Sequence, residues 1–119
     1  MEKIKEIKYE RENIFVVNGV ECMKNIVIFE DGSTAIRNGI LSIKGDTIKE
    51  MSANLKAATN KIGWWSLQAT SLKELKAAYR AGFRATTGIM ELSEHIEAFK
   101  KSGTLHVQKL VVGGNYYEC

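Results

Sequence analysis

Apolar and polar residues alternate over short runs in the N-terminal third of the chain, and turn-forming pairs separate the runs. Asn18-Gly19 divides the two apolar runs of "NIFVVNGVECM", and Asn-Gly suits a type I′ turn because it tolerates positive φ at both central positions. Asp31-Gly32 and Asn38-Gly39 repeat the signal. The expected strands are Ile26–Glu30, Ser33–Arg37 and Ile40–Lys44, with another over residues 3–9. The pattern predicts an antiparallel β-meander.

Apolar residues take helical spacing in the stretch between residues 46 and 63. The positions concerned are Ile48, Met51, Leu55, Ala58 and Ile62. Thr47 and Glu50 have the spacing of a capping box at the start of this helix, and Gly63 is its expected end. The segment "GWWSLQAT" after it is interpreted as a connector.

Two further apolar stripes follow the connector. The first consists of Leu72, Leu75, Tyr79 and Phe83, and the second of Ile89, Leu92, Ile96 and Phe99. Ser71 and Glu74 form a second capping box, and Gly103 ends the last stripe. One long helix over residues 72–101 is the alternative, but Gly82 and Gly88 would each cost about 1 kcal/mol inside it relative to alanine. The pattern therefore favours two helices with a break.

A strand is expected in "TLHVQKLVV" near the C-terminus. Leu105, Val107 and Val111 alternate there with His106 and Gln108. Lys109 falls on the apolar side of the alternation, which indicates an edge strand. A run of strands followed by helices predicts the α+β class, with about three helices on one face of an antiparallel sheet and this strand at the end. The length of 119 residues predicts a single domain over residues 1–119.

Composition is ordinary for a globular chain, with 45% hydrophobic and 26% charged residues. The first residues, "MEKIKEIKYERE", lack the apolar core of a secretory signal, and no stretch approaches the ~20 apolar residues of a membrane span. We therefore expect a cytoplasmic protein with no membrane partner and with reduced thiols. A disulfide between Cys22 and Cys119 is the alternative.

The break between the last two helices resembles a helix-turn-helix in spacing, because Ala78 precedes Gly82 by four residues. The second helix of that motif enters the DNA major groove with its first residues. Here those residues include three carboxylates, which would repel phosphates: Glu91, Glu94 and Glu97. A helical hairpin is therefore favoured. Its break remains a candidate anion site, since the next helix directs free N–H groups there. The candidate residues are Arg80, Arg84, Thr86 and Thr87.

Catalytic and metal-binding patterns are sparse. His95 lies four residues after Glu91 on the polar side of its helix, where the two side chains can pair at the surface. Cys22 follows a turn in an apolar strand, as buried structural thiols do. No zinc, calcium, P-loop or dinucleotide spacing occurs, so neither a metal nor a cofactor is expected. A non-catalytic protein is favoured, and a small enzyme using His95 or Cys22 is the alternative.

Binding candidates come from charge and aromatic content. The net charge of +3 permits phosphate-rich partners. Arg37 stands at the end of an expected strand, before Asn38-Gly39, where a solvated charge is the favoured interpretation. As a functional residue it would pair with a ligand phosphate or carboxylate, and Tyr116 could stack on a base. Trp64 and Trp65 are adjacent, so one of them is expected to be exposed or to contact another chain. The sequence favours a self-associating protein that binds a nucleotide or nucleic acid, with a protein-binding inhibitor or adaptor using these tryptophans or a sheet edge as the alternative.

Overall fold

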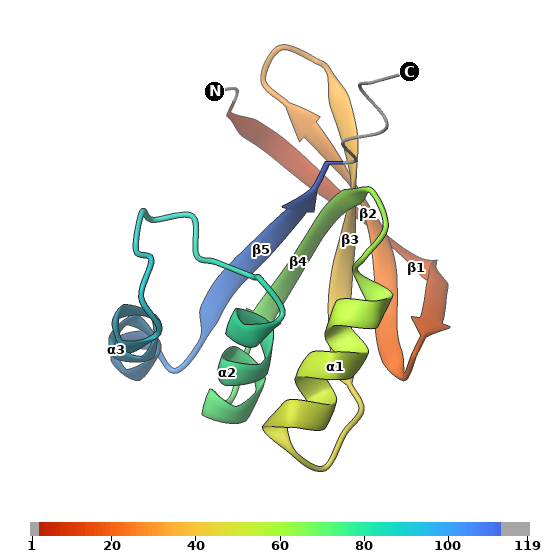
Figure 1. Cartoon of the computed structure of the whole chain (residues 1–119). Coiled ribbons are helices and arrows are strands. Elements are labelled where there is room, and N and C mark those ends of the chain that lie inside the picture. The colour runs from red at the N-terminus through yellow and green to blue at the C-terminus, as the bar shows by residue number, and fades with distance from the viewer. Residues whose placement is uncertain (1–2, 113–119) are drawn as a thin grey trace.

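The computed structural model describes residues 3–112, and the side chains of residues 9–13 are outside this description. In this range the chain forms one five-stranded sheet and three helices (Figure 1). The strands are β1 Ile4–Val17, β2 Val20–Phe29, β3 Thr34–Ile43, β4 Gly63–Ala69 and β5 Leu105–Val111. The helices are α1 Ile48–Ala58, α2 Leu72–Arg80 and α3 Leu92–Ser102. The predicted α+β class is confirmed.

The spatial order of the strands follows the chain, β1-β2-β3-β4-β5. β1, β2 and β3 form the expected antiparallel meander, and β4 pairs antiparallel with β5. β3 and β4 are parallel, because the connection through α1 returns the chain to the same end of the sheet. All three helices lie on one face of the sheet (Figure 1), and β5 lies at its edge, as predicted.

Two of the three predicted turns are confirmed. Asn18 and Gly19 both have positive φ, 50° and 74°, and join β1 to β2. Asp31 lies in the turn between β2 and β3, where its carboxylate accepts a hydrogen bond from the Ser33 N–H at 2.9 Å. The strand expected over residues 3–9 is the first part of β1.

The turn predicted at Asn38-Gly39 is wrong, because β3 runs without interruption through both residues. Asn38 pairs with Lys24 of β2, and Gly39 pairs with Met23. β4 occupies the other side of β3 at the same positions, so both residues are held in ladders. Gly39 allows the strands to approach closely here, because a Cβ atom at this position would lie 3.1 Å from the terminal amide group of Asn25.

The connector predicted at "GWWSLQAT" is also wrong, since residues 63–69 form β4, an interior strand between β3 and β5. Trp65, Leu67 and Ala69 point to the helix-covered face and are buried there. The intervening residues Trp64 and Ser66 therefore point to the opposite face. Pairing with strands on both sides decides the conformation of this segment, and such long-range pairing is not visible in the local pattern.

The predicted helix starts are confirmed for α1 and α2. The Thr47 hydroxyl accepts from the Glu50 N–H and the Ser71 hydroxyl from the Glu74 N–H, each at 3.1 Å. α1 ends at Ala58, earlier than predicted, because the chain turns to enter β4. Residues 81–91 separate α2 from α3, so the single long helix over residues 72–101 is excluded.

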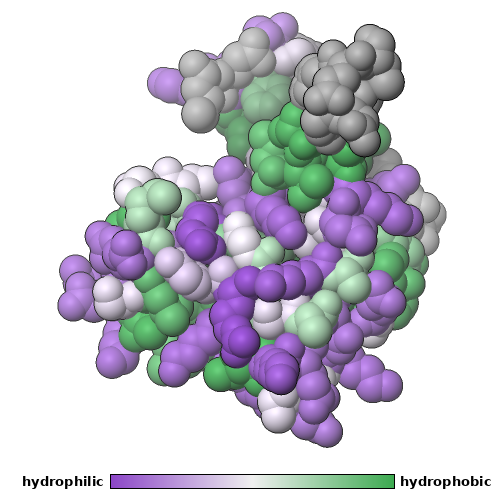
Figure 2. All heavy atoms as spheres, viewed as in Figure 1, coloured by the Kyte–Doolittle hydropathy of each residue, from purple (hydrophilic) through white to green (hydrophobic). Residues whose placement is uncertain are grey.

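The apolar core lies between the sheet and the helices. Fully buried side chains meet there from α1, α2 and the segment after α2: Leu55, Leu75 and Phe83. The outer surface on this side is largely hydrophilic, with a compact apolar patch near its upper end (Figure 2). Within residues 3–112, the helices cover one face of the sheet, and no helix covers the other face (Figure 1).

Candidate functional site

The uncovered face of the sheet, which we call the open face, gathers polar side chains from three strands. Strand register aligns Asn25, Arg37 and Trp64 in one cross-strand row, since Arg37 pairs with both neighbours. Gly39 and Ser66 lie in the next row. These residues alternate with the core-facing ones, so they point away from the helices.

A hollow of about 380 Å³ lies on the open face. Its lining residues come from all five strands: Ile7, Met23, Asn25, Arg37, Gly39, Ile40, Leu41, Ser66, Gln68 and His106. None of these residues carries a carboxylate, and Arg37 is a permanent cation. The hollow therefore combines a positive charge with neutral hydrogen-bonding groups.

Arg37 is the most unusual residue of the hollow. It is only 7% exposed, and its Nε–H has no hydrogen-bond partner among the residues that the structure describes. The amide of Asn25, oriented with its oxygen toward Arg37, accepts from a terminal guanidinium nitrogen at 3.2 Å. Burying a cation costs free energy unless an anion and hydrogen bonds compensate for lost water. Neutral Asn25 supplies only part of this compensation.

Trp64 forms the wall beside Arg37. The Arg37 Cζ atom lies 5.8 Å from the centroid of the Trp64 ring, within the range of a cation–π contact. The indole N–H donates to the Gln108 side-chain oxygen at 3.1 Å, which fixes the ring on the open face. Trp64 is half-buried.

The two tryptophans thus lie on opposite faces of β4. Trp65 is 4% exposed in the core, and its indole N–H donates to the Lys61 carbonyl at 3.2 Å. Adjacent residues in a strand point to opposite faces, which accommodates both rings without an irregular turn.

His106 approaches the hollow from β5. It pairs with Gln68 of β4, and both residues line the hollow. His106 is exposed to solvent along part of its ring, while desolvation on the side that faces the hollow lowers its pKa below the usual 6.5, and the charge of Arg37 lowers this pKa further. The imidazole is therefore held neutral near pH 7, and Arg37 acts on it electrostatically.

Gly39 forms part of the hollow's wall. A Cβ atom added there would meet the Asn25 amide at 3.1 Å and the Met23 carbonyl at 3.5 Å. Any side chain at this position would therefore crowd Asn25 and reduce the space beside Arg37.

The helical break, the other predicted anion site, lies apart from this hollow. Arg84 is engaged locally: Nη1 donates to the carbonyls of Tyr79 and Phe83 at 2.9 and 2.7 Å, and Cζ lies 3.7 Å from the Tyr79 ring centroid. The Arg84 backbone forms an antiparallel bridge with Gln108 and so covers the outer edge of β5 at that residue. The remaining candidates are exposed, and none lines the hollow: Arg80, Thr86 and Thr87. Tyr116 lies outside the described residues.

A carboxylate of α3 folds back onto the backbone just before the helix, in a capping box. A Glu94 oxygen accepts from the Glu91 N–H at 3.0 Å and from the Met90 N–H at 3.3 Å. The N–H groups that were expected to face a ligand are partly satisfied within the chain. This arrangement favours the Arg37 hollow over the break as an anion site.

The two catalytic candidates are buried. His95 was expected at the surface beside the Glu91 side chain, but it is 0% exposed. Its Nδ1 lies 2.7 Å from the Glu91 carbonyl, and Nε2 accepts from the Ala85 N–H at 3.1 Å. Cys22 is also 0% exposed, and burial, followed by the charge of Glu21, raises the pKa of its thiol to about 11. Neither group is poised as a base or nucleophile.

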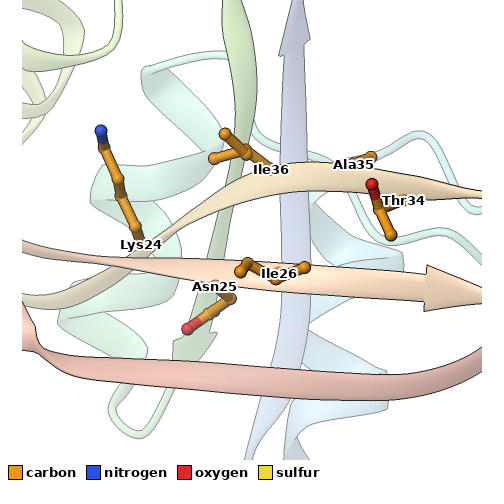
Figure 3. Close-up of a pocket in the computed structure, with 6 residues that line it drawn as sticks. All are labelled: Lys24, Asn25, Ile26, Thr34, Ala35 and Ile36. Atoms are coloured by element: carbon orange, nitrogen blue, oxygen red, sulfur yellow. The ribbon is translucent and has the colours of Figure 1, made fainter.

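A second hollow, of about 480 Å³, lies between residues 24–26 of β2 and residues 34–36 of β3. Its lining is Lys24, Asn25, Ile26, Thr34, Ala35 and Ile36 (Figure 3). Figure 3 shows Lys24 and Asn25 extending in opposite directions from β2, as strand geometry requires. Ile36 is 60% exposed here, and no carboxylate or buried cation converges on this hollow.

Sequence patterns identified Arg37 but not the residues around it. Asn25, Ser66, Gln68 and His106 reach the hollow through strand register, and only the alternation of β5 placed His106 away from the core. Among residues 3–112, no three His, Cys, Asp or Glu side chains are grouped to hold a metal ion.

Comparison with protein families, with curated proteins and with solved structures found no significant match for this chain. No helix in the described range is long and apolar enough to span a membrane.

Proposed function

We propose that this is a non-catalytic binding protein whose ligand places an anionic group beside Arg37 in the hollow of the open face. The observation that carries the proposal is the burial of Arg37, 7% exposed, in a hollow whose described lining residues include no carboxylate. A ligand phosphate or carboxylate would supply the missing counter-charge and accept from the unpartnered Nε–H.

A nucleotide, free or within a nucleic acid, is the favoured ligand class. Trp64 stands beside Arg37, so a base could stack near the ring while a phosphate reaches the guanidinium. Ser66 and Gln68 add neutral donors and acceptors along the same face. The net charge of +3 supports association with an anion.

The buried candidates support a non-catalytic role. The raised pKa of Cys22 keeps its thiol protonated, and the nitrogens of His95 are engaged with backbone groups. Trp65 belongs to the core, which leaves Trp64 as the tryptophan that an adaptor could use.

The proposal also includes a cytoplasmic location and self-association. Ile14 and Val16, on edge strand β1, are 49% and 65% exposed, so a second copy would bury apolar surface by pairing there. Sedimentation velocity over a range of protein concentrations tests this part, and a concentration-independent monomer would contradict it.

The ligand proposal is tested by calorimetric titration with inorganic phosphate, adenosine monophosphate and a single-stranded oligonucleotide at two salt concentrations. Arg37→Gln is compared with Arg80→Gln, which removes an exposed arginine outside the hollow. Binding is expected for the wild type and Arg80→Gln, with at least about tenfold weaker binding for Arg37→Gln, since a charge-assisted hydrogen bond contributes about 1.5–3 kcal/mol.

Loss of affinity in Arg37→Gln counts only if the variant is folded, which its amide NMR spectrum shows directly. Equal weakening by both substitutions would indicate a diffuse charge effect and would contradict a site at Arg37. The absence of binding to every probe at low salt would overturn the proposed function.

A further inference from the structure

Two residues of the hollow can carry positive charge, Arg37 from β3 and His106 from β5. They are separated by β4, whose Ser66 and Gln68 line the space between those strands. An anion in the hollow would therefore lie within electrostatic reach of both Arg37 and His106.

The free protein disfavours charge on His106. Partial burial and the nearby Arg37 cation both lower the pKa of this histidine. The second of these causes is repulsion between the Arg37 cation and a protonated His106. An anion bound between them would replace that repulsion with attraction and would favour the imidazolium form.

We infer that His106 is the second, titratable cation of the anion site, so that a doubly charged oxyanion binds more tightly when His106 is protonated. The inference rests on the proposed function, and it narrows the ligand to groups such as a phosphate monoester or sulfate. Binding of such a dianion takes up a proton, and by linkage the dianion raises the pKa of His106.

Among the side chains that the structure describes, no other titratable group lines the hollow. The neighbouring strands present neutral groups around His106 and Arg37: Ile7, Met23, Asn25, Gly39, Ile40, Leu41, Ser66 and Gln68. Glu21 shares the open face on β2 by strand alternation but does not line the hollow. A pH effect on anion binding at this site is therefore assigned to His106.

The experiment uses NMR titration of the histidine rings with and without sulfate, which stays a dianion across the range of interest. The chain has two histidines, and buried His95, bonded to the Glu91 carbonyl and the Ala85 N–H, is the internal control. Saturating sulfate is expected to raise the pKa of His106 by about one unit, while the His95 ring signals should not respond to sulfate. One unit corresponds to about tenfold tighter sulfate binding to the protonated form.

Single substitutions distinguish the role of His106 from that of Arg37. His106→Gln is expected to bind sulfate equally at acid and alkaline pH, at the wild-type's alkaline affinity. Arg37→Gln is expected to raise the pKa of His106 without ligand, because one cause of its lowering is removed. Methyl sulfate, a monoanion with the same tetrahedral head, is expected to shift the pKa of His106 less than sulfate does.

The outcomes distinguish this inference from the proposed function. Sulfate binding that depends on Arg37 but leaves the pKa of His106 unchanged would overturn the role of His106 and leave the proposed function standing. Retained pH dependence in His106→Gln would also overturn it. Sulfate that fails to bind while adenosine monophosphate binds through Arg37 would overturn only this inference, and failure of every anion would overturn both.

Discussion

The two faces of the sheet bury different chemistry. The helix-covered face buries Leu55, Leu75 and Phe83, whose apolar surfaces stabilise the fold by leaving water. The open face buries Asn25, Arg37 and Ser66, which are polar or charged and each 7% exposed or less, beside the smaller apolar pair Met23 and Val27. Buried polar groups contribute little to stability and carry a penalty when incompletely paired. Most of the stabilising apolar burial thus lies on the helix-covered face. The open face can therefore retain Arg37, a buried cation that lowers stability and serves the proposed binding site.

The largest expected effect lies on the helix-covered face. Phe83→Ala removes a fully buried ring and should lower the free energy of unfolding by about 3–5 kcal/mol. Urea denaturation followed by circular dichroism measures the change. Ile36→Ala is the matched control, since Ile36 is 60% exposed, and its change should stay within about 0.5 kcal/mol. Similar losses in both variants would contradict a core confined to the helix side.

A change of opposite sign is expected on the open face. Arg37→Met replaces a buried cation by an apolar chain of similar length and should raise the free energy of unfolding by about 1–2 kcal/mol. The same substitution should abolish anion binding, because function and stability compete at such a residue. The same denaturation measurement applies, with exposed Arg80→Met as the control. A marked loss of stability in Arg37→Met would identify Arg37 as a structural residue and contradict the comparison.

Turn and capping residues were predicted correctly where the local conformation depends only on neighbours in the sequence. Asn18-Gly19 and the Thr47 cap formed as expected, because turn geometry and capping depend on neighbours in sequence. The predictions of a turn at Asn38-Gly39 and of a connector at Trp64-Trp65 were wrong for the opposite reason. The backbones of these residues are held by strands on both sides, and pairing in a sheet overrides local turn preference.

The candidate site shows the same division. Arg37 could be selected from its residue type, whereas the lack of a counter-charge depends on which side chains the register brings beside it. The sequence pattern placed His106 only on the polar side of its strand. Its proximity to Arg37, which lowers the His106 pKa, depends on the long-range pairing of β4 with β5. Burial likewise reversed the expectation for His95, because the Ala85 N–H that it accepts from lies in the break before α3.

The smallest expected effect on stability comes from Gly39→Ala at the wall of the hollow. The added methyl group would lie 3.1 Å from the Asn25 amide and should displace the hydrogen bond between Asn25 and Arg37. Reduced freedom of the unfolded chain offsets this crowding, so stability should change by about 0.5 kcal/mol or less. Anion affinity should fall roughly fivefold, the worth of about one hydrogen bond. Calorimetric titration with sulfate measures it against Ser42→Ala, an exposed position on the same strand that does not line the hollow. Unchanged affinity in Gly39→Ala would place the anion away from the wall that Asn25 and Arg37 share.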